Sequence, residues 1–277
     1  MMSTETVDAG DTATPSREAR AVVEFEGIDK SFGGNSVLEG VNLAVRPGFT
    51  GLIGPNGAGK TTCLNVVSGY LRPDAGDVRL GGQSVIGMRP DKVARLGVSR
   101  TFQTPRLIPN LSAVENVMVG GGRHHRHGHI AELFGVPAAR RDEKDQRARA
   151  RELLGIFGLG EHPDRAANAF PIGSQKIIEV ARALLNDPLL LLLDEPAAGL
   201  GAEDVDRLVE GLNGWLAERP EAAVMIIEHD LELITRLCPT AAVLHFGRII
   251  QNGPPADVLR DPVVVEAYLG ADVAAGD

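Results

Sequence analysis

Two hydrophobic patterns divide the chain. Residues 21–32 (AVVEFEGIDKSF) and 36–48 (SVLEGVNLAVRPG) alternate apolar and polar side chains, which predicts half-exposed strands of an antiparallel sheet. Residues 49–55, 189–194 and 223–230 (FTGLIGP, LLLLLD and AVMIIEHD) are instead almost continuously apolar, and each precedes a helical pattern. Such runs predict buried parallel strands in an α/β core. We therefore expect two kinds of sheet in one molecule.

Helical periodicity accounts for much of the remaining sequence. Residues 203–219 repeat apolar side chains at helical spacing, which assigns Trp215 to packing. Residues 241–253 have the pattern of a strand, a tight turn and a second strand. Between about residues 105 and 185 charge-rich helical sequence predominates, with residues 140–151 as a solvated helix face. The pattern predicts a helical subdomain inserted into the α/β core.

Composition narrows the class of protein. The chain has 277 residues, of which 43% are hydrophobic, so it can bury a large core. Its net charge of −9 argues against a nucleic-acid partner. No apolar run approaches the roughly 18 residues that span a bilayer. Cys63 and Cys238 lack metal or disulfide spacing, so we expect buried thiols in a reducing compartment. Residues 1–20 are polar and small, which predicts a disordered tail before a folded domain at 21–277.

The sequence GPNGAGKT, from Gly54 to Thr61, follows an apolar strand and precedes a helix. Glycines let consecutive backbone N–H groups surround phosphate oxygens at a helix N-terminus. Lys60 would reach the β- and γ-phosphates and Thr61 would ligate Mg²⁺. The predicted ATP-binding set is Gly54, Pro55, Asn56, Gly57, Ala58, Gly59, Lys60, Thr61 and Thr62.

Carboxylates and an imidazole follow two of the predicted buried strands. Asp194 and Glu195 end the leucine run, and His229 follows the strand at 223–227. Phosphoryl transfer needs a carboxylate that orients the metal and a group that positions water. We expect Asp194 to act on Mg²⁺, Glu195 to be the general base, and His229 to lie where α/β sheets bind ligands.

The order of the P-loop, RTFQ, EVARAL, LLLLLDEP and IIEHD resembles the nucleotide-binding subunit of ATP-binding cassette (ABC) transporters. The resemblance covers about residues 22–270 and implies a P-loop NTPase core with an antiparallel β subdomain and an inserted helical subdomain. It implies that Phe32 stacks on adenine, that Gln103 contacts Mg²⁺ and the attacking water, and that His229 contacts the γ-phosphate. Membrane-spanning permease subunits would be the partners, with residues 104–111 (TPRLIPNL) in the docking groove.

The subfamily is indicated by ARLGVSRTFQTPRLIPNLSAVENVMVG, DEPAAGL and the terminal VVEAYLG. These segments resemble the ATPase subunits of branched-chain amino-acid uptake systems. The resemblance implies a peripheral ATPase at the cytoplasmic face of the plasma membrane, coupled indirectly to an extracytoplasmic solute-binding protein. Urea or other small-solute transporters share the general plan, as do lipopolysaccharide exporters. A soluble ABC ATPase that remodels ribosomes or DNA ends, and a regulatory module without turnover, remain as alternatives.

The family signature L-S-G-G-Q is altered. In the family it completes the ATP site of a partner subunit, and without a gap its five positions here are Phe170, Pro171, Ile172, Gly173 and Ser174. Pro171 brings neither hydroxyl nor N–H, and Ser174 replaces the glutamine, which a one-residue shift would restore as Gln175. We expect only residual anion binding at the N–H groups of Gly173 and Ser174.

A second departure is Gly201, which replaces the Asn or Asp that usually closes the dimer-contact loop. Both departures lie on the surface offered to the partner, whereas the residues of this chain's own phosphate site are intact. The hypothesis is a heterodimer in which this chain's own site hydrolyses ATP and the reciprocal site is slow. A homodimer is possible but should be a poor ATPase.

Four histidines lie in GGRHHRHGHI, at positions 124, 125, 127 and 129. Their spacing lacks a tetrahedral metal pattern, so we interpret the tract as a surface loop with zinc or nickel binding as the alternative.

Overall fold

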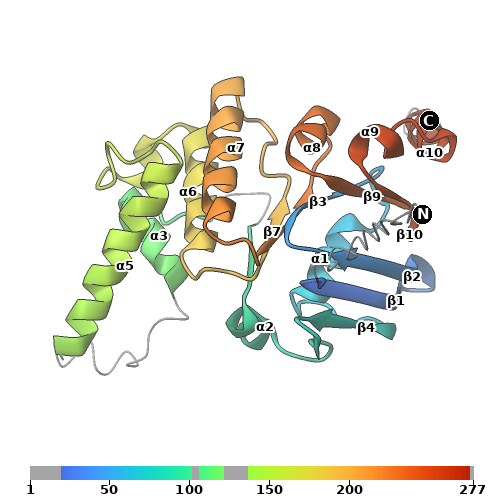
Figure 1. The fold of residues 1–277 in the computed structure, drawn as a ribbon, viewed down its shortest axis with the longest axis horizontal. Helices are drawn as coiled ribbons and strands as arrows, with labels where there is room; N and C mark the ends of the chain where they lie inside the picture. Colours follow the sequence, from blue (N-terminus) through green and yellow to red (C-terminus); the bar gives the residue numbers. More distant parts are fainter. Residues whose placement is uncertain (1–19, 102–105, 122–136, 275–277) are drawn as a thin grey trace, which may run out of the picture.

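The computed structural model describes residues 20–101, 106–121 and 137–274. Two sheets lie side by side, and a group of helices lies at the far end of the larger one (Figure 1). All but the last residue of the predicted tail at 1–20 and the four histidines of the tract fall outside the described residues.

The smaller sheet is antiparallel, as the alternating pattern predicted. It has the order β2-β1-β4-β5, formed by β1 (Val23–Phe32), β2 (Asn35–Val45), β4 (Ala75–Leu80) and β5 (Gln83–Ser84). β1 is the central partner, pairing Val23 with Val45 of β2 and with Leu80 of β4. The two-residue turn between β1 and β2 is Gly33–Gly34, and both glycines have positive φ, as a hairpin of this kind requires.

The larger sheet has the order β10-β9-β3-β8-β7-β6. Its strands are β3 (Gly48–Ile53), β6 (Val98–Arg100), β7 (Leu190–Asp194), β8 (Ala223–Ile227), β9 (Thr240–His245) and β10 (Arg248–Gly253). β3, β6, β7, β8 and β9 run parallel, and β10 pairs antiparallel with β9. The expectation of buried parallel strands is confirmed, and the carboxyl ends of β3, β7 and β8 meet at one edge.

The leucine run of β7 has two faces because successive side chains of a strand point in opposite directions. Leu190 and Leu192 pack in the cluster between the two sheets, which also contains Leu64 of α1 (Lys60–Val67). Leu191 and Leu193 pack on the other face. There they meet α7 (Ala202–Ala217) and α8 (Leu231–Leu237), and Trp215 of α7 is fully buried. The assignment of Trp215 to packing is confirmed.

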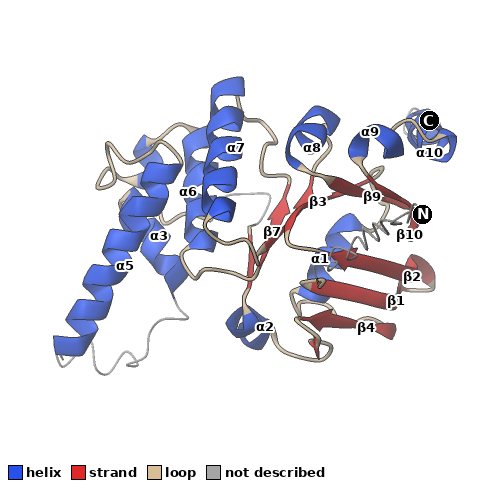
Figure 2. Cartoon of the chain, in the orientation of Figure 1, coloured by secondary structure: helices blue, strands red, loops and turns tan. Residues whose placement is uncertain are grey.

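Among the described residues between β6 and β7, helices predominate. They are α3 (Ala113–Met118), η1 (Val119–Gly121), α5 (Pro137–Ile156), η2 (Ala167–Ala169) and α6 (Ile172–Leu184) (Figure 2). Ser112 and Glu115 form a capping box that begins α3. Val117 of α3, Leu153 of α5 and Ile177 of α6 share one buried cluster with the outer face of the sheet. The inserted helices are therefore continuous with the core.

Short helices complete the fold. α2 (Pro90–Leu96) precedes β6, and α9 (Pro255–Val258) and α10 (Pro262–Ala274) follow β10. Both cysteines are buried free thiols, as expected, and burial raises the pKa of Cys63 and of Cys238 to about 12.

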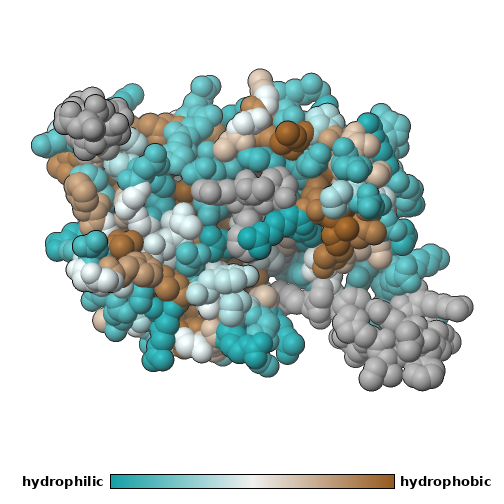
Figure 3. All heavy atoms as spheres, turned by 180° about the vertical axis from the view of Figure 1, so that it is seen from behind, coloured by the Kyte–Doolittle hydropathy of each residue, from teal (hydrophilic) through white to brown (hydrophobic). Residues whose placement is uncertain are grey.

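In the part of the chain that the structure describes, every helix is too short or too polar to cross a bilayer. On the face seen in Figure 3, hydrophobic residues form separate patches between hydrophilic ones.

Candidate active site

The loop between β3 and α1 lies very close to the backbone of neighbouring strands. Gly54 has φ 146°, and a Cβ there would lie 2.0 Å from the carbonyl oxygen of Leu244. Gly59 has φ 106°, and its Cβ would lie 2.8 Å from the carbonyl oxygen of Val37. Only glycine fits either position. The loop is thus held between β9 and β2, with its N–H groups next to the first turn of α1.

Lys60 is buried at the start of α1. Its Nζ donates hydrogen bonds to the carbonyl oxygens of Gly54 (2.6 Å) and Pro55 (2.8 Å). Burial lowers the pKa of Lys60, while the charges of Glu195 and Asp194 oppose that shift. The ammonium therefore lies inside the loop, close to both carboxylates.

Most of the other residues of the predicted phosphate loop are at least partly exposed to solvent. Asn56, Gly57 and Thr61 are exposed, and Pro55 and Thr62 are half-buried. Ala58 is buried, and its carbonyl oxygen accepts the Gly247 N–H at 3.1 Å. The Thr61 hydroxyl is thus accessible at the N-terminus of α1, where helix geometry favours anions.

Asp194 ends β7 and is only 3% exposed. Its Oδ2 accepts a hydrogen bond from Arg100 Nη2 at 3.1 Å, and Arg100 Nη1 also donates to Asn65 Oδ1 at 2.7 Å. Within the described ranges, Asp194 Oδ1 is buried without a hydrogen-bond partner. Burial raises the pKa of Asp194, and the Arg100 hydrogen bond opposes the shift. A buried carboxylate oxygen with a free lone pair is the type of ligand that Mg²⁺ prefers.

Glu195 and His229 form a pair across neighbouring strand ends. Glu195 Oε1 and His229 Nε2 lie 2.8 Å apart, with the ring nitrogen donating when it carries the proton. β7 and β8 are adjacent parallel strands, in register at Asp194 and Ile227, so the residues that follow them meet. Glu195 has φ 51°, in the left-handed region, and its N–H donates to the carbonyl oxygen of Ile227 at 2.9 Å. This geometry suits a carboxylate base held by an imidazole.

Phe32 lies at the end of β1, where 49% of the residue is exposed. The Nζ of Lys30 lies 5.4 Å from the centre of its ring. The following strand, β2, contacts the phosphate loop through Val37 and Leu38. An accessible ring beside that loop fits the predicted stacking role, which stays a prediction.

The predicted signature lies at the start of α6. Pro171 is the N-cap and offers no polar side chain to the helix, and Ile172 is 71% exposed. Gly173 and Ser174 are buried, and the expected residual anion binding at their N–H groups stays a prediction. Gln175 is turned back, with Nε2 donating to the Phe170 carbonyl oxygen at 2.9 Å. The exposed face of this helix start is therefore apolar.

The start of α6 packs closely against α7. A Cβ on Gly173 would lie 2.0 Å from Asp204 Oδ2, so this carboxylate covers the first turn of α6. Lys176 of α6 donates to the carbonyl oxygen of Ala198, in the turn after β7. Gly201 is the N-cap of α7. The start of α6 and the predicted dimer-contact loop thus form one packed unit.

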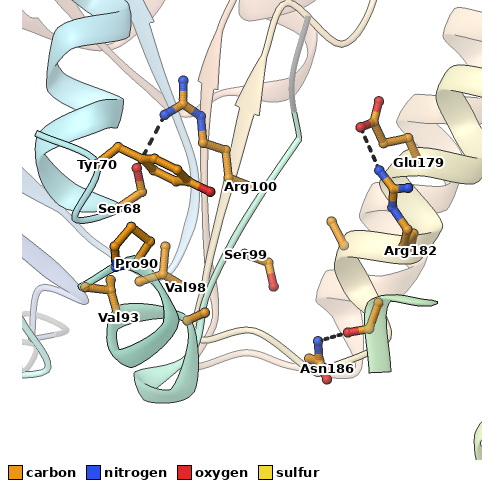
Figure 4. A pocket seen from close by; sticks show the side chains of 13 residues that line it. Ser68, Tyr70, Pro90, Val93, Val98, Ser99, Arg100, Glu179, Arg182 and Asn186 are labelled. Atoms are coloured by element: carbon orange, nitrogen blue, oxygen red, sulfur yellow. Dashed lines mark hydrogen bonds and ion pairs between the residues drawn. The ribbon is translucent and has the colours of Figure 1, made fainter. Parts of the chain in front are cut away.

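A pocket of about 220 Å³ separates α6 from the β6 region (Figure 4). Tyr70, Val93 and Arg100 line one side, and Glu179 and Arg182 line the other. Arg182 pairs with Glu179 at 2.9 Å and also donates to the Arg106 carbonyl oxygen at 2.7 Å. The pocket therefore adjoins Arg106, which belongs to the segment predicted to dock the permease.

Several predictions were incomplete. Gln103 lies outside the described residues. Sequence reasoning missed Arg100, although it stands directly before Thr-Phe-Gln, and Glu228, although it directly precedes His229. Adjacency to a predicted site residue was the available signal for both.

A phosphate-binding loop, a buried carboxylate and a carboxylate–imidazole pair at the carboxyl edge of a parallel sheet define a P-loop ATPase. A model of the ABC transporter family matches residues 38–198, and a model of branched-chain amino acid ATP-binding cassette transporters matches residues 248–274. The chain belongs to the ABC transporter family, as an ATP-hydrolysing subunit of its branched-chain amino acid class.

Individual relatives agree with this assignment. The chain is 38% identical to the high-affinity branched-chain amino acid transport ATP-binding protein BraF of Pseudomonas aeruginosa, over 91% of this chain and 99% of the relative. It is 35% identical to LivG of Escherichia coli K12 over the same shares. The ADP conformation of MJ1267, an ATP-binding cassette of an ABC transporter, superposes with a TM-score of 0.78 and 30% identity, covering 91% of this chain and 100% of that one. The fold class and family resemblance are confirmed.

Proposed function

We propose that this chain hydrolyses ATP to drive import of branched-chain or related amino acids through membrane-spanning permease subunits. The match of residues 248–274 and the names of the relatives support the substrate class. The main structural support for ATP hydrolysis is the 2.8 Å contact between Glu195 Oε1 and His229 Nε2, beside the loop that holds Lys60.

Each residue has a distinct part in the reaction. Lys60 and the N–H groups of the phosphate loop hold the phosphates, so the γ-phosphorus faces water near Glu195. Glu195 accepts a proton from that water as its oxygen attacks the γ-phosphorus and ADP leaves. His229 holds the Glu195 carboxylate and contacts the γ-phosphate, and Gln103 contacts the attacking water.

The donor set near Asp194 fits Mg²⁺. Asp194 Oδ1 is a buried oxygen without a partner among the described residues, and the Thr61 hydroxyl is exposed. Magnesium keeps several waters and uses few protein oxygens, so Thr61 and Asp194, with the predicted Gln103, would hold it. The ion would neutralise charge that develops on the phosphate oxygens.

The second ATPase subunit of the complex is proposed to be a different chain. The exposed face at the start of α6 offers Pro171 and Ile172 to a partner's ATP, so the site completed by this chain would be slow. The site formed by Lys60, Asp194, Glu195 and His229 would turn over against an intact partner signature. A homodimer would contain two weakened sites.

The permease is proposed to dock at the pocket between α6 and the β6 region. Its walls are partly apolar, at Tyr70 and Val93, and partly charged, at Glu179 and Arg182. The adjoining Ile108 is exposed. The chain would then work at the cytoplasmic face of the inner membrane, and a solute-binding protein would act from the other side.

Glu195→Gln in the assembled complex tests the catalytic assignment. The amide cannot accept the proton, so we expect phosphate release to fall about 10²-fold or more with ATP still bound. Phosphate release and retained radiolabelled ATP are measured on the same sample. Unchanged hydrolysis, with loss on the equivalent change in the partner, would reverse the assignment of the active site.

Uptake identifies the cargo. Cells that carry Lys60→Ala should lose uptake of labelled leucine and keep uptake of labelled urea. Lys144→Ala, at an exposed position on α5, serves as the matched control and should leave both uptakes intact. Loss of urea uptake alone would replace the amino-acid assignment.

A further inference from the structure

Glu228 is a buried carboxylate in direct contact with two loops. It follows β8 and is 3% exposed. Oε1 accepts the N–H of Ala197 at 2.7 Å, and Oε2 accepts the N–H of His229 at 3.2 Å. One side chain thus satisfies backbone donors on both strand-end loops.

The two loops are those that carry the catalytic pair. Ala197 lies two residues after Glu195, in a turn closed by the 3.3 Å bond from Ala198 N–H to the Glu195 carbonyl oxygen. His229 directly follows Glu228. The Glu195 backbone has φ 51°, a conformation that persists only where neighbouring bonds impose it. Glu228 supplies such a bond to the turn and, through its second oxygen, to the His229 backbone.

The hydrogen bonds also explain why a carboxylate occupies this position. Burial raises the pKa of Glu228, and the N–H donors of Ala197 and His229 oppose that shift. Every partner named here is a donor, and a carboxylate is an acceptor at both oxygens. A glutamine of the same shape keeps one acceptor and replaces the other by an NH₂ group that meets an N–H.

We propose that Glu228 is a positioning residue, which holds the turn of Glu195 and the backbone of His229 in the relative placement that lets the two side chains meet. The inference rests on the proposed roles of Glu195 and His229 in hydrolysis. Glu228 acts through its hydrogen bonds to the backbone N–H groups of Ala197 and His229.

Glu228→Gln in the purified transport complex is the test. Since a small misplacement of reacting groups is costly while the phosphate loop is untouched, kcat should fall about tenfold to 10²-fold and KM for ATP should stay within about twofold. Glu232→Gln, an exposed change four residues further on, is the matched control and should match the wild type. Binding of a fluorescent ATP analogue counts the folded sites in each preparation.

A double variant separates positioning from general damage. In the Glu195→Gln background, Glu228→Gln should lower kcat by less than about twofold, because both residues act in the same step. Wild-type kcat for Glu228→Gln, full additivity in the double variant, or a kcat loss that matches a loss of binding sites would overturn the inference. If Glu195→Gln itself keeps normal hydrolysis, the proposed catalytic roles fail and this inference fails with them.

Discussion

The phosphate-binding edge of the parallel sheet and the start of α6 differ in kind. The sheet edge gathers Lys60, Asp194, Glu195 and His229, with a buried carboxylate oxygen that lacks a partner among the described residues and a glutamate in a left-handed conformation. The start of α6 is well packed and offers an apolar surface at Ile172. Strained backbone and unpaired buried polar atoms are energetically unfavourable, and such features cluster at functional sites. The comparison supports the proposal that this chain's chemistry lies in the first region.

The largest effect should come from Lys60→Ala at the sheet edge. Lys60 is the cation inside the phosphate loop, so we expect phosphate release by the assembled complex to fall about 10³-fold. Thermal melts in the absence of ATP show whether the variant is folded. A turnover within about twofold of the wild type would show that the chemistry lies elsewhere, which would break the comparison.

Arg100→Ala tests whether the sheet edge depends on its buried ion pair. The side chains of Arg100 and Asp194 are 7% and 3% exposed, and removing one partner leaves an uncompensated buried charge, at a cost of about 3–5 kcal/mol in the free energy of unfolding. Urea unfolding is followed through the fluorescence of Trp215, the sole tryptophan of the chain.

The matched control is Arg79→Ala in the small sheet. Arg79 forms an ion pair with Asp77 at 3.0 Å, but its side chain is 42% exposed. Exposed pairs contribute about 0–1 kcal/mol. If Arg100→Ala and Arg79→Ala lost equal free energy of unfolding, burial of the Arg100–Asp194 pair would not increase its contribution to stability.

Local patterns explain which parts of this architecture were predictable. The phosphate loop is contiguous in sequence, so Gly54, Gly59 and Lys60 could be assigned from spacing alone. The placement of Glu195 and His229 at one sheet edge followed from parallel strands, whereas their 2.8 Å contact was seen only in the structure. The Arg100–Asp194 pair joins residues 94 positions apart, and the contact of Glu228 with Ala197 depends on how two loops pack. Sequence spacing carries no information on such contacts.

At the start of α6, the sequence predicted backbone donors but could not predict how accessible they are. The motif register placed Pro171 at the second signature position, and the structure places it at the N-cap of the helix. The burial of Gly173 and Ser174 depends on α7, whose Asp204 approaches Gly173. A helix N-terminus in a sequence predicts N–H donors, whereas their accessibility depends on the neighbouring helix.

Phe32→Ala should give a moderate effect, confined to binding. Loss of the ring removes stacking worth about 1–3 kcal/mol, so KM for ATP should rise about tenfold while kcat stays unchanged. Phe32→Tyr keeps the ring and should retain the wild-type KM. A fall in kcat at constant KM would instead place Phe32 in the chemical step.

The smallest effect on total turnover is expected from Pro171→Ser, the change that restores a cap at the start of α6. A serine N-cap should stabilise the helix by about 1 kcal/mol and supply a hydroxyl toward a partner's ATP. In a heterodimer one of the two sites already works against an intact signature, so total phosphate release should rise at most about twofold.

In a homodimer both sites would gain the missing donor, and hydrolysis should rise by up to about 10²-fold. Pro171→Ala is the control, because it restores the N–H without the hydroxyl. Phosphate release from complexes of known subunit composition distinguishes the cases. A large gain would remove the heterodimer proposal and show that the apolar start of α6 limits both sites equally. A twofold gain or less would leave the sheet edge as the region where this chain's chemistry resides.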